Sequence, residues 1–155
     1  MAGGKPGQPL VVDTLRYTLV MQDEVYAQGV SAVRAALAAD GVACNDMKNF
    51  WKGTQMYRGI NDIYIANTDV LEVGDLYFEL QFHTPASLEA KLSVHGSKYA
   101  VFRAEDISQE EKVKTYYELV EVMNRVPIPS GAEDLPKPVT RSPPVPLEPK
   151  GKGAK

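Results

Sequence analysis

The segment from Leu76 to His83, "LYFELQFH", constrains the fold of this chain more than any other stretch. Apolar residues alternate in it with residues that form hydrogen bonds, and a period of two is typical of a β-strand. The apolar residues predict one face that packs in a core. The other face is either solvent-exposed, the commoner situation, or the lining of a site. Its residues are Tyr77, Glu79, Gln81 and His83.

Length and composition exclude several classes of protein. The 155 residues suffice for one domain with a core. No apolar run could span a bilayer and no signal peptide opens the sequence, so we expect no membrane partner. The formal net charge of −3 gives no general attraction for nucleic acid, so we expect no nucleic-acid partner. The single cysteine, Cys44, cannot form an internal disulfide and is interpreted as structural.

Glycine and proline content predicts three regions. Residues 1–9, "MAGGKPGQP", are interpreted as a linker or an expression remnant. Residues 10–125 are expected to form the folded domain. Residues 126–155 contain eight of the eleven prolines and no periodic apolar pattern, which predicts an extended or disordered tail.

Within residues 10–125 the sequence predicts interleaved strands and helices. Strands are expected over 10–21, 42–51, 56–67 and 76–83, with a hairpin connection at 68–75. Helices are expected over 23–40, from Thr84 onward and over 108–125, with Asp23, Thr84 and Ser108 as caps. Gly59 indicates a bulge or a close approach to the backbone. Because the later strands are joined by connections too short for crossover helices, we expect an α+β fold with a mixed, largely antiparallel sheet flanked by helices.

Four short pieces of the sequence stand out together. They are Asp13 with Arg16, "MKNFWKG" at 47–53, "YRGIN" at 57–61 and "ELQFHT" at 79–84. In this order they resemble the synthetase domain of the RelA/SpoT family, whose members transfer pyrophosphate from ATP to the ribose 3′-hydroxyl of a nucleotide. The last piece resembles the family's Glu-x-Gln-x-x-Thr strand, and the third resembles its Gly-Tyr-x-x-x-His segment. The resemblance covers residues 10 to about 103 and extends to His95 and Tyr99.

The resemblance implies a set of site residues. Glu79 and Asp13 would be the catalytic carboxylates and would also hold Mg²⁺, a hard cation that selects carboxylate oxygens. Glu79 would accept the proton of the attacking hydroxyl. Tyr57 is expected to stack on the acceptor base. The other nucleotide-binding candidates, of which the basic ones are expected at phosphates, are Arg16, Lys48, Lys52, Arg58, Asn61, Gln81, His83 and His95.

Several of these residues have structural alternatives. A tyrosine such as Tyr57, taken alone, more often packs half-buried in the protein than forms a surface (a base platform) on which a nucleotide base stacks. His95 is equally well a structural histidine. Arg58 is one residue out of phase with Tyr57, so it should point to the opposite strand face unless Gly59 reorients it. Trp51 is expected in the core.

The chain also departs from the family pattern. Asn61 replaces the usual His, and His83 replaces the usual Arg. The basic helix that helps to bind ATP in the family has no counterpart before Leu10, so either other residues bind the donor or the chain is the terminal part of a longer protein. The Gly/Pro-rich start favours the second view. A module of this kind resembles secreted antibacterial effector toxins, which act in the cytoplasm and are countered by an immunity protein.

We therefore expect a pyrophosphokinase that uses ATP and a purine acceptor to make (p)ppGpp or (p)ppApp. Adenine acceptors are slightly favoured, because a toxin that used them would consume ATP as both donor and acceptor. One alternative is a catalytically inactive module of the same fold that senses nucleotides. Another is an interaction domain in which the Pro-rich tail docks in extended form.

Overall fold

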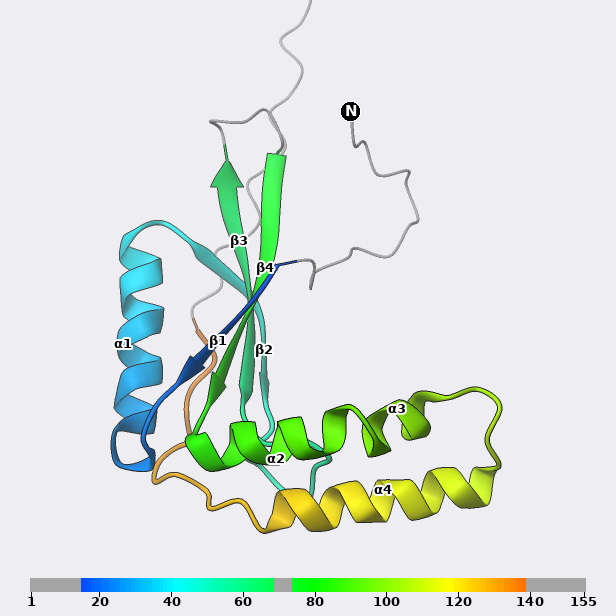
Figure 1. Cartoon of the computed structure of the whole chain (residues 1–155). Helices are drawn as coiled ribbons and strands as arrows, with labels where there is room; N and C mark the ends of the chain where they lie inside the picture. The colour runs from blue at the N-terminus through cyan, green and yellow to red at the C-terminus, as the bar shows by residue number, and fades with distance from the viewer. Residues whose placement is uncertain (1–14, 69–73, 139–155) are drawn as a thin grey trace, which may run out of the picture.

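The computed structural model describes residues 15–68 and 74–138 of the chain. A four-stranded sheet in the order β1-β4-β3-β2 lies at its centre (Figure 1). The strands are β1 (Arg16–Val20), β2 (Ala43–Asn49), β3 (Ile60–Thr68) and β4 (Gly74–His83). β1 runs parallel to β4, whereas the β2–β3 and β3–β4 pairs are antiparallel. The predicted α+β fold with a mixed, largely antiparallel sheet is confirmed.

The helices are a 3₁₀ turn (Asp23–Val25), α1 (Tyr26–Ala39), α2 (Pro85–His95), α3 (Lys98–Arg103) and α4 (Gln109–Asn124). Thr84 and Ser108 cap α2 and α4 as predicted, since their side chains accept from the backbone N–H groups of Ser87 and Glu111. Asp23 is not a cap, because a 3₁₀ turn precedes α1. The short helix α3 was not predicted. None of the described helices is long and apolar enough to cross a membrane.

One face of the sheet packs against α1 and forms the main core. Leu80 and Phe82 of β4 lie in it, together with Trp51, which is fully buried as predicted. Trp51 Nε1 donates to the Tyr26 hydroxyl (2.9 Å), which in turn donates to the Phe82 carbonyl (2.8 Å). This pair of hydrogen bonds fixes the start of α1 on the sheet. Cys44 is buried in the same core, and burial raises the pKa of its thiol to about 12.

The other face of β4 is polar but not solvent-exposed. Glu79, Gln81 and His83 are 6%, 4% and 0% exposed, so the interpretation as a solvated surface is wrong. The reason lies in the chain that follows: α2 begins directly after β4, and α2, α3 and α4 lie together at one end of the sheet (Figure 1). A second small core joins these helices and contains Val94 and Met123.

Residues 126–138 pack on the domain, which corrects the prediction that everything after Arg125 is an extended or disordered tail. Three of their apolar residues are buried: Val126, Ala132 and Leu135. Arg34 of α1 donates to the Pro136 carbonyl (2.9 Å), and Asn49 of β2 donates to the Ala132 carbonyl (2.8 Å). The segment has no helical or strand period because it buries single residues from an irregular backbone. Residues 1–9 and 139–155 lie outside the described part of the chain.

Gly59 marks a close approach of backbone segments, as predicted. Its φ is +148°, and a Cβ there would lie 2.9 Å from the Phe82 carbonyl oxygen and 3.2 Å from the His83 ring. Strand β3 begins at the next residue. A side chain at position 59 would therefore push the 50–59 loop away from β4.

Candidate active site

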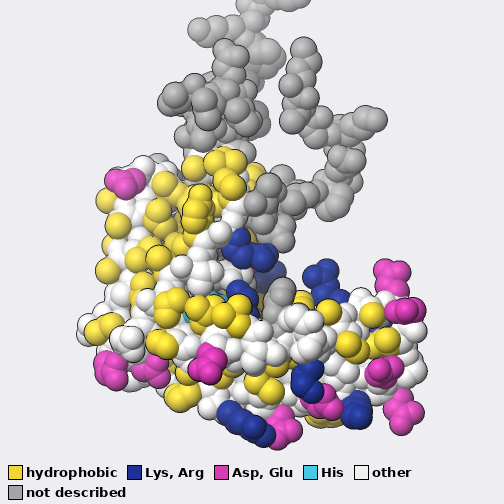
Figure 2. Space-filling model, in the orientation of Figure 1, with side chains coloured by type: hydrophobic (Ala, Val, Ile, Leu, Met, Phe, Trp, Pro, Cys, Tyr) yellow, Lys and Arg dark blue, Asp and Glu magenta, His cyan; other side chains and the backbone are white. Residues whose placement is uncertain are grey.

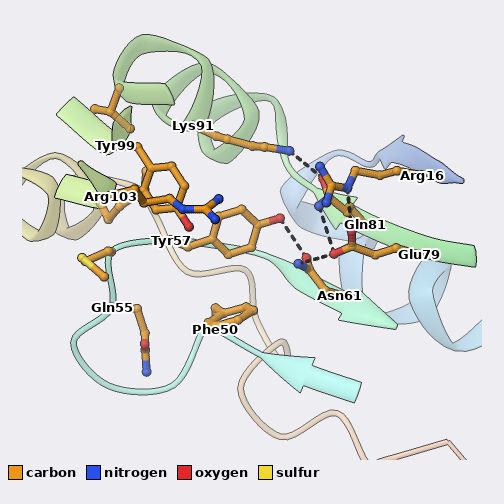
Figure 3. A pocket seen from close by; sticks show the side chains of 13 residues that line it. Arg16, Phe50, Gln55, Tyr57, Asn61, Glu79, Gln81, Lys91, Tyr99 and Arg103 are labelled. Carbon is orange, nitrogen blue, oxygen red and sulfur yellow. Dashed lines mark hydrogen bonds and ion pairs between the residues drawn. The ribbon is translucent and has the colours of Figure 1, made fainter. Parts of the chain in front are cut away.

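A pocket of about 310 Å³ opens on the polar face of the sheet, between β3, β4, the 50–59 loop and the helices (Figure 3). Figure 2 shows Lys and Arg side chains where the surface is hollowed between the sheet and the helices. The lining residues are Arg16, Phe50, Gln55, Met56, Tyr57, Asn61, Glu79, Gln81, Lys91, Val94, Tyr99, Arg103 and Met123. Their side chains divide the pocket into a polar end and an aromatic end.

The polar end is built around the Glu79 carboxylate. Glu79 Oε2 accepts from Arg16 Nε at 2.5 Å. Glu79 Oε1 accepts from Asn61 Nδ2 (2.8 Å) and Gln81 Nε2 (3.2 Å). These groups meet because β4 lies between β1 and β3, with Arg16 opposite Glu79 and Asn61 opposite Gln81. Both carboxylate oxygens are therefore held in fixed directions on a rigid sheet.

Among the described residues, three cationic side chains line the pocket: Arg16, Lys91 and Arg103. Lys91 Nζ donates to Gln81 Oε1 (2.5 Å) and lies 5.9 Å from the centre of the Tyr57 ring. Burial and the Arg16 charge lower the pKa of Lys91. Arg103 lies 5.9 Å from the centre of the Tyr99 ring. Three cations and one carboxylate line the described pocket, and this excess of positive charge favours an anionic ligand.

Tyr57 forms the centre of the aromatic end. Its ring packs edge-on against Phe50, with centroids 5.0 Å apart. Its hydroxyl lies 2.9 Å from Asn61 Oδ1 and 2.7 Å from His83 Nε2. Burial, reinforced by the Glu79 charge, raises the pKa of Tyr57 and keeps the hydroxyl protonated. The ring thus stands as a fixed aromatic surface beside the polar end (Figure 3).

The structure brings together five of the predicted site residues, from three different strands and one loop. They are Arg16, Tyr57, Asn61, Glu79 and Gln81. Lys48 and Lys52 are exposed and do not line the pocket, although Lys48 pairs with Asn61 across β2 and β3 and so shares its sheet face. Their predicted phosphate contacts stay predictions.

Arg58 is not among the residues that line the pocket, and its predicted phosphate contact stays a prediction. Its side chain is buried beneath the 50–59 loop. Its guanidinium donates to the carbonyls of Phe50, Trp51 and Gly53 at 2.9–3.2 Å, and to Asn124 Oδ1 at 3.2 Å. Arg58 is out of phase with Tyr57, as the alternative interpretation had it, so it joins the loop to the C-terminal end of α4.

His83 also lies behind the pocket wall, and its predicted direct contact with a nucleotide stays a prediction. The ring is fully buried, with Nε2 directed at Tyr57 and Nδ1 directed at Ser87 Oγ (2.8 Å). Burial, together with the Lys91 charge, lowers the pKa of His83 to about 4. Its neutral ring therefore contacts the Tyr57 hydroxyl from the buried side of the pocket wall.

The described structure does not place two of the predicted residues relative to the pocket. Asp13 lies outside the described residues, so its roles as a catalytic group and a metal ligand stay predictions. His95 is the last residue of α2, and its predicted contact with nucleotide also stays a prediction.

Sequence reasoning missed the contribution of the helices to the pocket. Lys91 and Arg103 were not among the predicted site residues, and no role was predicted for Phe50, Gln55 or Met56. A signal for Lys91 exists: it lies four residues after Ser87 and three before Val94, and both of these are buried. This i, i+4, i+7 spacing defines the helix face that turns toward the sheet.

Mg²⁺ is the cofactor that the resemblance implies, and Glu79 offers it one suitable ligand. Glu79 is the only carboxylate among the described lining residues, and carboxylate oxygen is what Mg²⁺ prefers. Its Oε2 is occupied by Arg16, which a cation would have to replace. Within residues 15–68 and 74–138, no three His, Cys, Asp or Glu side chains cluster as a metal site. Glu79 thus fits a Mg²⁺ that takes most of its ligands from water and phosphate.

Solved structures with a similar fold are synthetases of alarmone nucleotides. Small alarmone synthetase 1 from Bacillus subtilis, bound to its product pppGpp, gives a TM-score of 0.53 at 14% identity, over 75% of this chain and 59% of its own. Small alarmone synthetase 2 from the same organism gives 0.53 at 14% identity, over 77% and 64%. A GTP pyrophosphokinase family protein from Streptococcus pneumoniae gives 0.50 at 15% identity, over 74% and 59%.

The similarity is one of structure. No protein-family model and no curated protein matches the sequence. This chain spans about three fifths of the length of the three solved proteins. Over about three quarters of its length, this chain nevertheless shares the fold of the small alarmone synthetases.

Proposed function

We propose that this chain is a nucleotide 3′-pyrophosphokinase, which transfers pyrophosphate from ATP to the ribose 3′-hydroxyl of a purine nucleotide. One observation carries the proposal: a buried carboxylate and an aromatic ring lie in one pocket, with cationic side chains around them. A nucleotide needs a surface for its base and cations for its phosphates, and the reaction needs a proton acceptor at the ribose. The fold shared with synthetases of pppGpp and related nucleotides supports the same reaction.

Four of the pocket residues have a defined task in this reaction. The acceptor base stacks on the Tyr57 ring, an interaction worth about 1–3 kcal/mol per base. Arg16 and Lys91 contact phosphate oxygens, Arg16 as a planar fork and Lys91 as a point charge. Glu79 accepts the proton of the 3′-hydroxyl as that oxygen attacks the β-phosphorus of ATP. The bond between the α-phosphate oxygen and the β-phosphorus breaks, and AMP leaves.

The Arg16–Glu79 ion pair must open before this chemistry. Arg16 occupies Glu79 Oε2 in the described state, and its side chain is 44% exposed, so it can turn to an incoming phosphate. That movement frees one carboxylate oxygen for the hydroxyl proton or for Mg²⁺. When bound, Mg²⁺ neutralises charge on the triphosphate, and Glu79 with Asp13 would be its carboxylate ligands.

The proposal extends to the acceptor nucleotide and to the biological role of the chain. We propose an adenine nucleotide as the slightly preferred acceptor, over a guanine nucleotide. A toxin with this preference would use ATP twice, as donor and as the source of the acceptor. The role that we propose is therefore that of a toxic effector module, which acts in the cytoplasm and is countered by a cognate immunity protein.

One observation favours a second candidate, a nucleotide-binding module without catalysis. Both oxygens of Glu79 already accept hydrogen bonds, and the carboxylate would stay occupied if Arg16 did not move. Such a module would bind nucleotides through Tyr57 and Lys91 and release no AMP.

Incubation with ATP and Mg²⁺ separates the two candidates. AMP, ADP, GDP and GTP are supplied as acceptors in separate reactions, and the products are resolved by chromatography. We expect a 3′-pyrophosphorylated product and an equal amount of AMP from at least one acceptor. Nucleotide binding in calorimetry without AMP release would support the binding module, and the absence of both would refute the site.

A further inference from the structure

A chain of hydrogen-bonding contacts connects the start of α2 to the Glu79 carboxylate. It runs from Ser87 Oγ to His83 Nδ1 (2.8 Å) and from His83 Nε2 to the Tyr57 hydroxyl (2.7 Å). It continues from that hydroxyl to Asn61 Oδ1 (2.9 Å) and from Asn61 Nδ2 to Glu79 Oε1 (2.8 Å). All four contacts have normal hydrogen-bond lengths. The base platform and the carboxylate are thus two parts of one network.

Proton counting gives this network a direction. Tyr57 has one hydroxyl proton, and two neighbouring atoms could accept it: Asn61 Oδ1 and His83 Nε2. Asn61 directs its NH₂ group to Glu79, so its oxygen needs a donor, and Tyr57 supplies it. His83 Nε2 must then carry the ring proton and donate to the Tyr57 oxygen. Nδ1 is left as an acceptor, and the Ser87 hydroxyl, whose other acceptor is the Thr84 carbonyl (3.2 Å), can donate to it. The three bonds from His83 Nε2 to Glu79 Oε1 then point the same way, toward the carboxylate.

The surroundings of His83 hold the ring in one place. Its ring is fully buried. Ser87 is anchored by the capping box of α2, in which its backbone N–H donates to Thr84 Oγ1 (3.1 Å) and its Oγ accepts from Thr84 N–H (2.9 Å). Gly59 closes the other side, where a Cβ would lie 3.2 Å from the ring. Burial and the contacts at both ring nitrogens hold the imidazole in place, so its Nε2 is directed at the Tyr57 hydroxyl.

We propose that His83 is a positioning residue, which as the Nε2–H tautomer orients Tyr57 and, through Asn61, the Glu79 carboxylate. The inference rests on the proposed transferase function. It assigns to His83 a task different from phosphate contact: the ring fixes the angle of the base platform and the direction of the carboxylate together. Fixed positions of the Tyr57 ring and the Glu79 carboxylate matter for the rate, because misplacement of reacting groups by about 1 Å lowers it up to about a hundredfold.

Two amide substitutions test the proposal as a matched pair. His83→Gln places an amide NH₂ near the former Nε2, within reach of Tyr57. His83→Asn is one methylene shorter and reaches only the Ser87 side. We expect His83→Asn to lower kcat/KM for the acceptor about tenfold or more, the scale of one lost orienting hydrogen bond, while His83→Gln retains most of it. KM for ATP should stay unchanged in both variants, and circular dichroism confirms that each is folded.

A double-mutant cycle separates positioning from loss of stability. Tyr57→Phe removes the hydroxyl that receives the His83 proton. In that background, His83→Asn should cost less than about a twofold further loss, because the link is already broken. If His83→Asn instead lowers activity equally with and without the hydroxyl, or if it equals wild type, the proposal is overturned.

Nuclear magnetic resonance of ¹⁵N-labelled histidine gives a readout that needs no activity. The chain contains only two histidines, so the His95→Gln variant assigns the His83 signals. We expect the neutral Nε2–H tautomer at pH 7, and its Nε2 shift should change in Tyr57→Phe. An Nδ1–H tautomer overturns the proposal. If wild type forms no product but the Nε2–H tautomer is seen, the proposed function fails and the network stands as an element of a binding site.

Discussion

The substitution Glu79→Gln tests the carboxylate at the centre of the pocket, because it preserves size and removes charge. Glu79 Oε1 accepts from Asn61 and Gln81, whereas Oε2 accepts from Arg16 Nε. The amide oxygen of Gln can replace Oε1, and its NH₂ group then faces the Arg16 guanidinium. The variant therefore loses one charge-assisted hydrogen bond and keeps the other two.

The structure limits the cost of this loss to stability. A buried charge-assisted bond is worth about 1.5–3 kcal/mol. The Arg16 side chain is 44% exposed, however, so water replaces much of what the ion pair provided. We expect the free energy of unfolding to fall by about 1 kcal/mol in chemical denaturation. The protein should remain folded and should still bind nucleotide.

Activity should respond far more strongly. Removal of a general base lowers the rate about 10² to 10⁴-fold, so we expect pyrophosphate transfer to fall at least a hundredfold in the chromatographic assay. Glu121→Gln is the matched control, because Glu121 forms an exposed ion pair with Arg125. It should change stability by less than about 0.5 kcal/mol and leave activity intact. A folded Glu79→Gln protein with near wild-type transfer would refute the assigned role of Glu79.

Three further predictions follow from the packing. A chain truncated after Arg125 should unfold at a lower temperature than one truncated after Pro138, since it lacks the buried residues of the 126–138 segment; equal thermal unfolding of both would contradict the packing. Arg58→Lys should lower the free energy of unfolding by about 2 kcal/mol, because three loop carbonyls lose their donor, with nucleotide affinity in calorimetry unchanged. Burial lowers the pKa of His83 to about 4, so the unfolded chain takes up a proton below about pH 6.5 while the folded chain does not. The stability of wild type relative to His83→Gln should therefore decrease as pH falls from about 6.5 to 4, by about 3 kcal/mol in total; a pH-independent difference would contradict the neutral buried ring.

Local patterns in the sequence determined most of the secondary structure. The alternation at 76–83 predicted β4, and Thr84 with Pro85 predicted the start of α2, because strand period and helix capping depend on neighbouring residues. The same reasoning failed where local signals are weak. Helix α3 is six residues long and too short for a periodic pattern, and the 126–138 segment buries its apolar residues without any period.

The site was determined only in part by the sequence. Resemblance to a family motif led to Glu79, Gln81 and Tyr57, which the structure places around one pocket. The side-chain directions of Arg58 and His83 came only from the tertiary structure. Gly59 lets the 50–59 loop approach β4, and this contact turns Arg58 under the loop and encloses His83 behind Tyr57.

The helices supplied the rest of the pocket, and no local pattern could place them. Lys91 reaches Gln81 because α2 runs across the end of the sheet directly after β4, and Arg103 reaches the pocket because α3 follows α2 closely in the chain. The sequence by itself determined which residues carry charge, aromatic rings and carboxylates. Which of them face one another was decided by the packing of the helices against the sheet, because contacts between distant segments depend on how whole elements bury their surfaces.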